Sequence, residues 1–300
     1  MPSMHSKDRQ HRDLEWALHS TPLVGEGTPA FIWPSSTWFA NLPSLPRSLN
    51  LPAPKYPNHF RLGHHFERLL EYWLNHQRYF DLMAANLQIN QDKRTLGEFD
   101  FLVKHKEKVA HWETAIKFYL VYGDNENPFH WFGPNPKDSL GDKYTHLINH
   151  QLPLSEHPDS IKLLSEMSIE VDSALCFMKG RLFYPFEQFF LEEFLHPSIV
   201  NPNHGKGWWL TTSAFTLHFD NTRQYKLLEK SYWLAPLEKD IKGESLDSIS
   251  KRITGPKAQT ASLIAVLDDD DKELSRGFVV NENWINLASS KSLHRDKLQR

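Results

Sequence analysis

The chain has 300 residues, enough for one large domain or two modest ones. Its 34 Lys and Arg nearly balance its 37 Asp and Glu, and the net charge of −3 excludes a ribosomal-type polycation and an acidic disordered tail. Aromatic residues make up 13%, which is typical of folded chains. Because Cys176 is the single cysteine, the sequence excludes an internal disulfide and a thiolate zinc cluster, so any metal ligand must be oxygen or imidazole.

The first residues, MPSMHSKDRQHRD, are polar and lack the apolar segment of a signal peptide. No stretch approaches the roughly 18 apolar residues of a membrane span. We therefore expect a cytoplasmic protein without a membrane-spanning segment. Residues 1–12 are predicted to be disordered, and residues 13–19 (DLEWALH) to form a short helix.

Five prolines fall within the fifteen residues from Pro43 to Pro57. Because proline fixes φ and lacks a backbone donor, this composition predicts an extended connector. We expect three parts: an N-terminal arm and connector over 1–57, a core over 58–190 and a C-terminal extension over 191–300.

The start of the core shows a helical pattern followed by an alternating one. A helix is predicted over 63–85, because apolar residues recur at helical spacing and form one stripe: Phe66, Leu69, Leu70, Trp73 and Leu74. The apolar period then shortens to that of a strand. This alternation predicts strands over 86–90, 99–103 and 110–122, with the turn HKEKV joining the second strand to the third.

The later segments have weaker local signals. We predict helices over 139–150 and 159–175, a strand pair around Lys179 and Gly180, a strand over 205–210, a helix over 223–234, and a hairpin of 262–267 with 277–280. This order favours a mixed α+β core of about 130 residues with additions at both ends.

Two carboxylates interrupt otherwise apolar strands, Asp100 between two phenylalanines and Glu113 beside a tryptophan. If the two strands pair through the HKEK turn, Asp100 comes close to opposite Glu113. Two such carboxylates repel each other, and burial adds a desolvation cost. A divalent cation between them would remove both problems, and oxygen ligands favour Mg²⁺ or Mn²⁺ over zinc. Such a cation can activate water and stabilise charge on a phosphate.

Other side chains are candidates for the same site. Glu67 would be a third metal ligand if the first core helix packs across the strands, and Lys117 would orient the water or offset phosphate charge. Glu98 is expected on the face opposite Asp100 and outside the site. The alternative is structural: Asp100 and Glu113 would pair with lysines of the hairpin turn, Glu67 would be solvated, and Lys117 would extend from a strand edge.

The segment GEFDFL (97–102), followed by Glu113, resembles the PD-(D/E)XK nuclease superfamily. The resemblance implies a restriction-endonuclease-like core: an α/β (α+β) arrangement of helix, three-stranded hairpin sheet, helix and strand. It implies a nuclease dependent on Mg²⁺ or Mn²⁺, with Glu67, Asp100 and Glu113 as metal ligands, and Asp100, Glu113 and Lys117 as catalytic residues. Nucleic acid would be the partner, with DNA favoured over RNA. Gln151 lies where some relatives carry a helix glutamine.

Most of the chain also resembles the bacterial family called domain of unknown function eighteen fifty-three, in stretches such as RDLEWAL, WFGPNPKDSLGDK and RGFVV. That resemblance implies the nuclease-like fold and brings no substrate with it.

The lysine departs from the superfamily pattern, which places it two residues after the glutamate. Here that residue is Ala115, and the lysine is Lys117. Four strand residues span about 13 Å, against about 6.6 Å for two. Lys117 must therefore lean back along the strand, or Lys143 must reach in instead. The displacement leaves a second function open: a catalytically inactive nuclease-like fold that binds nucleic acid or a protein.

Overall fold

A computed structural model describes residues 7–25, 27, 29–51, 61–91, 94–239, 241–256 and 258–298. The predicted mixed α/β class is confirmed, and the chain forms two compact units, each assembled from separate stretches of sequence. Unit 1 consists of Met1–Ile116, Tyr144–Lys179 and Ile199–Asn203, and unit 2 consists of Lys117–Lys143, Gly180–Ser198 and His204–Arg300. The three-part division expected from the sequence and the restriction-endonuclease-like core remain predictions.

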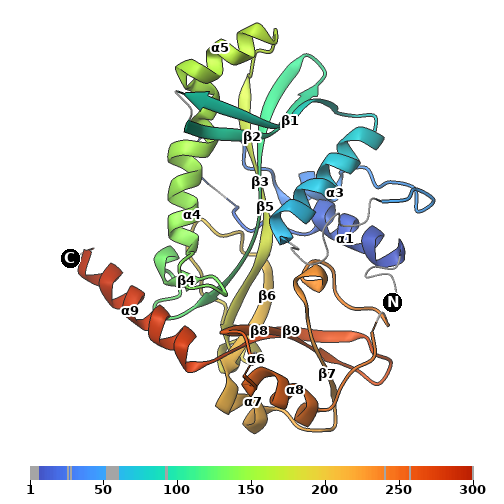
Figure 1. The fold of residues 1–300 in the computed structure, drawn as a ribbon, viewed down its shortest axis with the longest axis vertical. Helices are drawn as coiled ribbons and strands as arrows, with labels where there is room; N and C mark the ends of the chain where they lie inside the picture. The colour runs from blue at the N-terminus through green and yellow to red at the C-terminus, as the bar shows by residue number, and fades with distance from the viewer. Residues whose placement is uncertain are drawn as a thin grey trace. The chain divides into compact units, whose positions relative to one another are not determined.

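Unit 1 contains an antiparallel sheet with flanking helices (Figure 1). The helix α1 lies beside α3. The elements of this unit are α1 (Lys7–His19), α2 (Ser36–Ala40), α3 (Leu62–His76), β1 (Asp81–Gln91), β2 (Arg94–His105), the start of β3 (Lys108–Val121), η3 (Leu147–Gln151), η4 (Leu152–Glu156), α5 (Pro158–Glu166) and the start of β5 (Ser173–Pro185).

The apolar stripe of α3 is buried, as predicted, but the helix ends at His76 and not near residue 85. The side chain of Gln77 causes this early end. Its amide donates to the carbonyl of Leu74, and its oxygen accepts from the backbone N–H groups of Tyr79 and Phe80. The following residues then join β1, where Ala84 and Ala85 pair with β2. Pairing with a neighbouring strand therefore overrides the helix propensity of alanine.

The predicted hairpin of the second and third strands is confirmed, and both strands are longer than expected. The register pairs Phe101 with Trp112 and Lys104 with Val109, and Lys106 turns the chain with a φ of 56°. Trp112 anchors β3 in the core of unit 1, with its ring 5.7 Å from the rings of both Trp38 and Phe177. The hairpin is therefore fixed against the same core as α3, where Trp73 also contacts Trp112.

Four other predictions in the first half of the chain need correction or completion. The prediction of disorder is wrong for residues 7–12, which belong to α1; residues 1–6 lie outside the described residues. Of the Pro-rich connector, residues 43–51 form no helix or strand, and residues 52–60 lie outside the described part. The segment predicted as one helix over 139–150 is α4 (Leu140–His146) followed by the π-helical turn η3. The helix over 159–175 is wrong beyond α5, because β5 begins at Ser173 and runs as one strand through Gly180.

Unit 2 is built around parallel and antiparallel strands. Strand β6 (Gly205–Thr211) pairs in parallel with the end of β5 and with β9 (Glu273–Val280), and β8 (Ala261–Leu267) pairs antiparallel with β9 and with β7 (Gln224–Leu227). The remaining elements are the end of β3, η2 (Pro128–His130), β4 (Trp131–Phe132), the start of α4, α6 (Phe186–Phe190), α7 (Thr212–His218), η5 (Lys230–Tyr232), α8 (Leu246–Thr254) and α9 (Glu282–Leu298).

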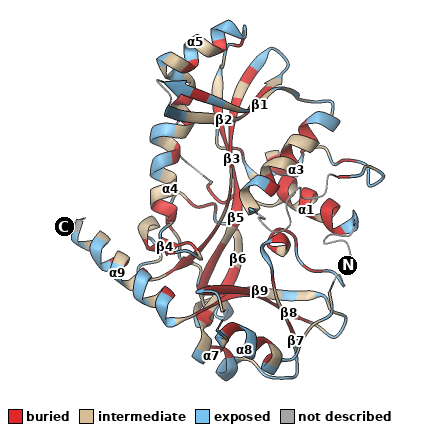
Figure 2. Ribbon diagram, in the orientation of Figure 1, coloured by how far each residue is buried: buried red, intermediate tan, exposed pale blue. Residues whose placement is uncertain are grey.

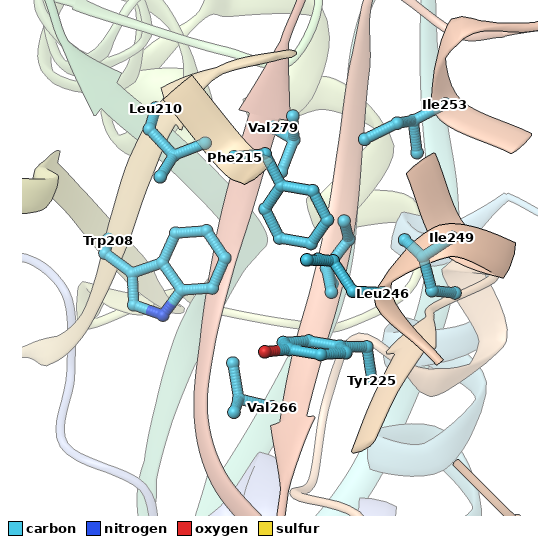
Figure 3. Close-up of a cluster of buried hydrophobic side chains, with 10 residues drawn as sticks. Trp208, Leu210, Phe215, Tyr225, Leu246, Ile249, Ile253, Val266 and Val279 are labelled. Carbon is cyan, nitrogen blue, oxygen red and sulfur yellow. The ribbon is translucent and has the colours of Figure 1, made fainter. Parts of the chain in front are cut away.

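The strand at 205–210 and the hairpin of β8 with β9 are confirmed, whereas the helix over 223–234 is wrong. Residues 224–227 pair with β8, and a short 3₁₀ turn follows. Behind β6, β8 and β9 lies an apolar cluster into which α7 and α8 insert Phe215 and Ile249 (Figure 3). Strand β8 is buried along its whole length (Figure 2). This two-sided burial decides the strand pairing in unit 2.

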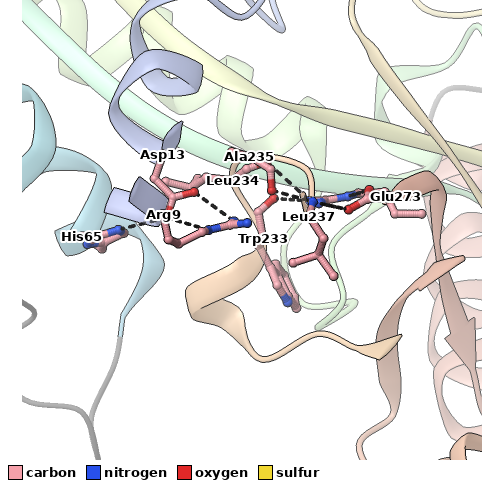
Figure 4. A network of polar contacts seen from close by, with 9 residues as sticks. Arg9, Asp13, His65, Trp233, Leu234, Ala235, Leu237 and Glu273 are labelled. Carbon is pink, nitrogen blue, oxygen red and sulfur yellow. Dashed lines mark hydrogen bonds and ion pairs between the residues drawn. The ribbon is translucent and has the colours of Figure 1, made fainter. Parts of the chain in front are cut away.

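Each unit also contains buried charges that are paired (Figure 4). In unit 1 the guanidinium of Arg9 lies 2.9 Å from Asp13, and both side chains are almost fully buried. In unit 2 Arg276 donates to Glu273 at 2.7 Å and to the carbonyl of Ala235 at 3.0 Å. Such pairs satisfy buried charge within the fold. Among the described residues, no helix combines the length and apolar composition needed to cross a membrane.

Candidate functional site

Asp100 lies at a fork between two strands. The ladder between β2 and β3 ends at the pair Phe101 and Trp112, so Asp100 and Glu113 are the next residues along the same register. This agrees with the pairing expected from the sequence. Oδ2 of Asp100 accepts hydrogen bonds from the backbone N–H and the hydroxyl of Thr114, at 2.7 and 2.9 Å. The carboxylate thus occupies a backbone donor that the ladder no longer uses.

The backbone is irregular on the other side of Asp100 as well. Along β1, Ala85 pairs with Phe101 and Leu87 pairs with Phe99, which leaves Asn86 facing Asp100. Asn86 has a φ of 52°, a conformation that residues with a side chain seldom adopt. Strained positions of this kind gather at functional sites, so this irregularity marks the middle of β2 as a candidate.

Glu67 on α3 lies among negative charges. Burial is the main cause that raises its pKa to about 7, and the charges of Asp100 and Glu98 act in the same direction. The side chain remains 26% exposed, and one oxygen lies 3.5 Å from Nδ1 of His64. The structure therefore brings together Glu67, Glu98 and Asp100, from one helix and one strand.

The expectation that Glu98 lies away from Asp100 is wrong. Residues two apart in a strand point to the same face, and the charges of both residues act on Glu67. Glu98 also accepts a hydrogen bond from Gln88 of β1 at 3.1 Å. Strict alternation along GEFDFL contained this signal.

Glu113 has a different set of contacts. Its side chain is buried, and Oε1 accepts a hydrogen bond from the side-chain amide of Gln151 at the end of the π-helical turn η3. Its other oxygen, Oε2, lies 3.7 Å from Nε2 of His111, a residue that the sequence did not single out. Alternation along β3 would have found His111, because it precedes Glu113 by two residues and shares its face.

The two candidate lysines belong to unit 2, whereas the carboxylates belong to unit 1. Lys117 forms an ion pair with Asp138 at 2.7 Å, and the hydroxyl of Tyr119 lies 3.4 Å from the other oxygen of Asp138. Lys143 lies in the first turn of α4, where its backbone N–H donates to the carbonyl of Ser139. The local surroundings of both lysines are thus set by unit 2.

Within the ranges that the structure describes, no three side chains of His, Cys, Asp or Glu are grouped to hold one metal ion. Glu67, Asp100 and Glu113 therefore do not form such a group. The smaller set of Glu67 and Asp100, with Glu98 beside them, still fits a hard cation. Magnesium commonly takes one or two carboxylates and completes its sphere with water and substrate phosphate. The crowding around Glu67, which needs either a proton or a cation, matches that donor set.

Comparison with known proteins gives a family and no activity. No curated protein and no solved structure matches this chain. Residues 12–280 match the family described as Domain of unknown function (DUF1853). This match includes both candidate carboxylate clusters and nearly all of both units, so the chain belongs to that family.

Proposed function

We propose that this protein is a divalent-metal-dependent phosphodiesterase of the PD-(D/E)XK type that acts on nucleic acid, with DNA favoured over RNA. The observation that supports this proposal most is the gathering of Glu67, Glu98 and Asp100 at the fork where β2 leaves β3. Carboxylates on one strand and one helix, held close enough to raise a pKa, are typical of a site that takes a cation.

Glu67 and Asp100 would hold Mg²⁺ or Mn²⁺, which supplies a Lewis acid and a water of lowered pKa when bound. The protein's own groups set the geometry. Both hydrogen bonds from Thr114 fix the carboxylate of Asp100, and Gln151 fixes that of Glu113. Glu67 gives up its proton as the cation arrives, because a positive charge offsets the repulsion from Asp100 and Glu98.

The test is cleavage of single-stranded DNA, duplex DNA and RNA by the purified protein with each metal. We expect metal-dependent cleavage that Asp100→Asn and Glu67→Gln each reduce at least tenfold, a loss of about 1.4 kcal/mol of transition-state stabilisation. Glu71→Gln is the matched control, since Glu71 lies one turn further along α3 and should leave cleavage unchanged. Cleavage that persists in both site variants would refute the assignment.

A second function is favoured by the ion pair between Lys117 and Asp138. If this lysine serves only Asp138, the protein would bind nucleic acid without cutting it. Binding that weakens steeply with salt, with no turnover in any metal, would support this function over the first.

A further inference from the structure

His111 is a buried residue whose role the fold alone does not explain. It lies on β3 and is fully buried, with its ring packed edge-on against Phe99 at 4.8 Å. Neither ring nitrogen has a hydrogen-bond partner among the described residues. A buried polar group without a partner costs free energy, and such groups in native proteins usually have a functional reason.

The neighbour of His111 is the second oxygen of Glu113. Nε2 lies 3.7 Å from Oε2, while Oε1 of the same carboxylate accepts from Gln151. Burial lowers the pKa of His111 to about 3, so the ring is neutral. A neutral imidazole has one N–H and one acceptor nitrogen, and only an N–H at Nε2 gives the carboxylate a donor.

We propose that His111 is a positioning residue for Glu113, with the Nε2–H group directed at Oε2. The separation exceeds a normal N–H···O distance by about 0.5 Å, and catalytic hydrogen bonds are often long in a free enzyme and shorten on ligand binding. Gln151 and His111 would then hold one oxygen each and fix the plane of the carboxylate. The consequence for catalysis depends on the proposed function; the tautomer and the contact do not.

The tautomer is tested by ¹⁵N–¹H spectra of the histidine side chains in the full chain, with His111 assigned by loss of its signals in His111→Phe. We expect a neutral ring with its proton on Nε2, and a shift of that resonance in Glu113→Gln. A proton on Nδ1, or no response to Glu113→Gln, would overturn the proposal.

Two substitutions separate positioning from packing. His111→Phe keeps an aromatic ring against Phe99 and removes the donor, whereas His111→Gln keeps an N–H donor and removes the ring. If His111 positions Glu113, the Phe variant binds Mn²⁺ about tenfold more weakly and the Gln variant stays near wild type, as for other groups that orient metal ligands. His105→Phe, at an exposed histidine of β2, is the control and should change nothing.

The opposite order, a Phe variant like wild type and a weakened Gln variant, would reduce His111 to a packing residue. Nitrogen coupling to bound Mn²⁺ that is lost in His111→Phe would also overturn the proposal, because His111 would then be a ligand. Failure of the proposed function has a separate signature: the wild type would bind no Mn²⁺ or cleave no nucleic acid, and the histidine spectra would still decide the role of His111.

Discussion

The ammonium group of Lys117 lies 2.7 Å from Oδ2 of Asp138, in a pair whose side chains are 28% and 40% exposed. The hydroxyl of Tyr119 lies near the other oxygen of Asp138. This pair fixes the lysine that the nuclease resemblance would assign to catalysis. Its partner is a loop aspartate, which no strand motif could have indicated.

We expect Asp138→Asn to lower the free energy of unfolding by no more than about 1 kcal/mol, because a partly exposed pair is screened by water. Urea denaturation measures this change. Glu282→Gln, at an exposed position, provides the baseline. If Lys117 acts on substrate, Asp138→Asn also alters the cleavage rate; an unchanged rate in both Asp138→Asn and Lys117→Met would remove Lys117 from the mechanism.

Glu67 makes stability depend on pH. Its pKa is about 7 in the folded state against 4.5 for an unperturbed glutamate, so the folded state binds more protons between these values. The free energy of unfolding therefore falls as pH rises from about 4.5 to 7. At about 1.4 kcal/mol per pH unit, Glu67→Gln should recover up to roughly 3 kcal/mol above neutral pH.

This pH dependence is measured by urea denaturation of the wild type and Glu67→Gln across the range, with Glu71→Gln as the control on the same helix. The two curves should converge at low pH, where Glu67 is protonated and uncharged. Parallel curves for wild type and Glu67→Gln would show that Glu67 titrates normally.

The double contact between Thr114 and Asp100 is testable by removing its hydroxyl. Thr114→Val keeps the backbone N–H bond and deletes the side-chain donor. Because the acceptor is a carboxylate in a partly buried setting, we expect a loss of about 1–3 kcal/mol of stability. Thr95→Val, which deletes an exposed hydroxyl bonded to Asn90, should cost well under that amount. Equal losses in thermal or urea unfolding would contradict the importance of this contact.

The helix α9 follows the part of the chain that matches the family, and Trp284 anchors it. This side chain is fully buried, and its Nε1 donates to the carbonyl of Gly133 at 3.0 Å. We expect Trp284→Ala to lower the free energy of unfolding by about 3–5 kcal/mol, as large aromatic truncations do. Hydrogen exchange should accelerate over residues 133–142, since α9 also reaches this loop through Lys291 and Arg295.

Leu287→Ala is the matched control for this helix, because Leu287 is 51% exposed. Its truncation should leave both unfolding and exchange near wild type. A loss in Trp284→Ala no greater than in Leu287→Ala would show that α9 is not anchored by its tryptophan.

The sequence predicted best the features that depend on neighbours along the chain. The apolar stripe of α3 and the hairpin of β2 and β3 follow from local periodicity and a short turn, and that hairpin places Asp100 opposite Glu113. Glu67 was also a sound candidate, because its helix packs by the same stripe that identified it.

Errors occurred where a distant partner decides the conformation. Residues 224–227 form a strand only because β8, about forty residues later, offers its edge, and Ala84 and Ala85 join β1 through pairing with β2. The end of α3 depends on the side chain of Gln77, whose capping bonds no periodicity reveals.

By itself, then, the sequence determined the mixed α/β class, the hairpin register and the carboxylates on it, because alternation and helical spacing are encoded in adjacent residues. Tertiary structure alone decided how those carboxylates divide. Packing of α3 brings Glu67 to Asp100 and Glu98, while the turn η3 and β3 place Gln151 and His111 at Glu113. Burial and charge act through space, and only the folded chain sets which groups feel them.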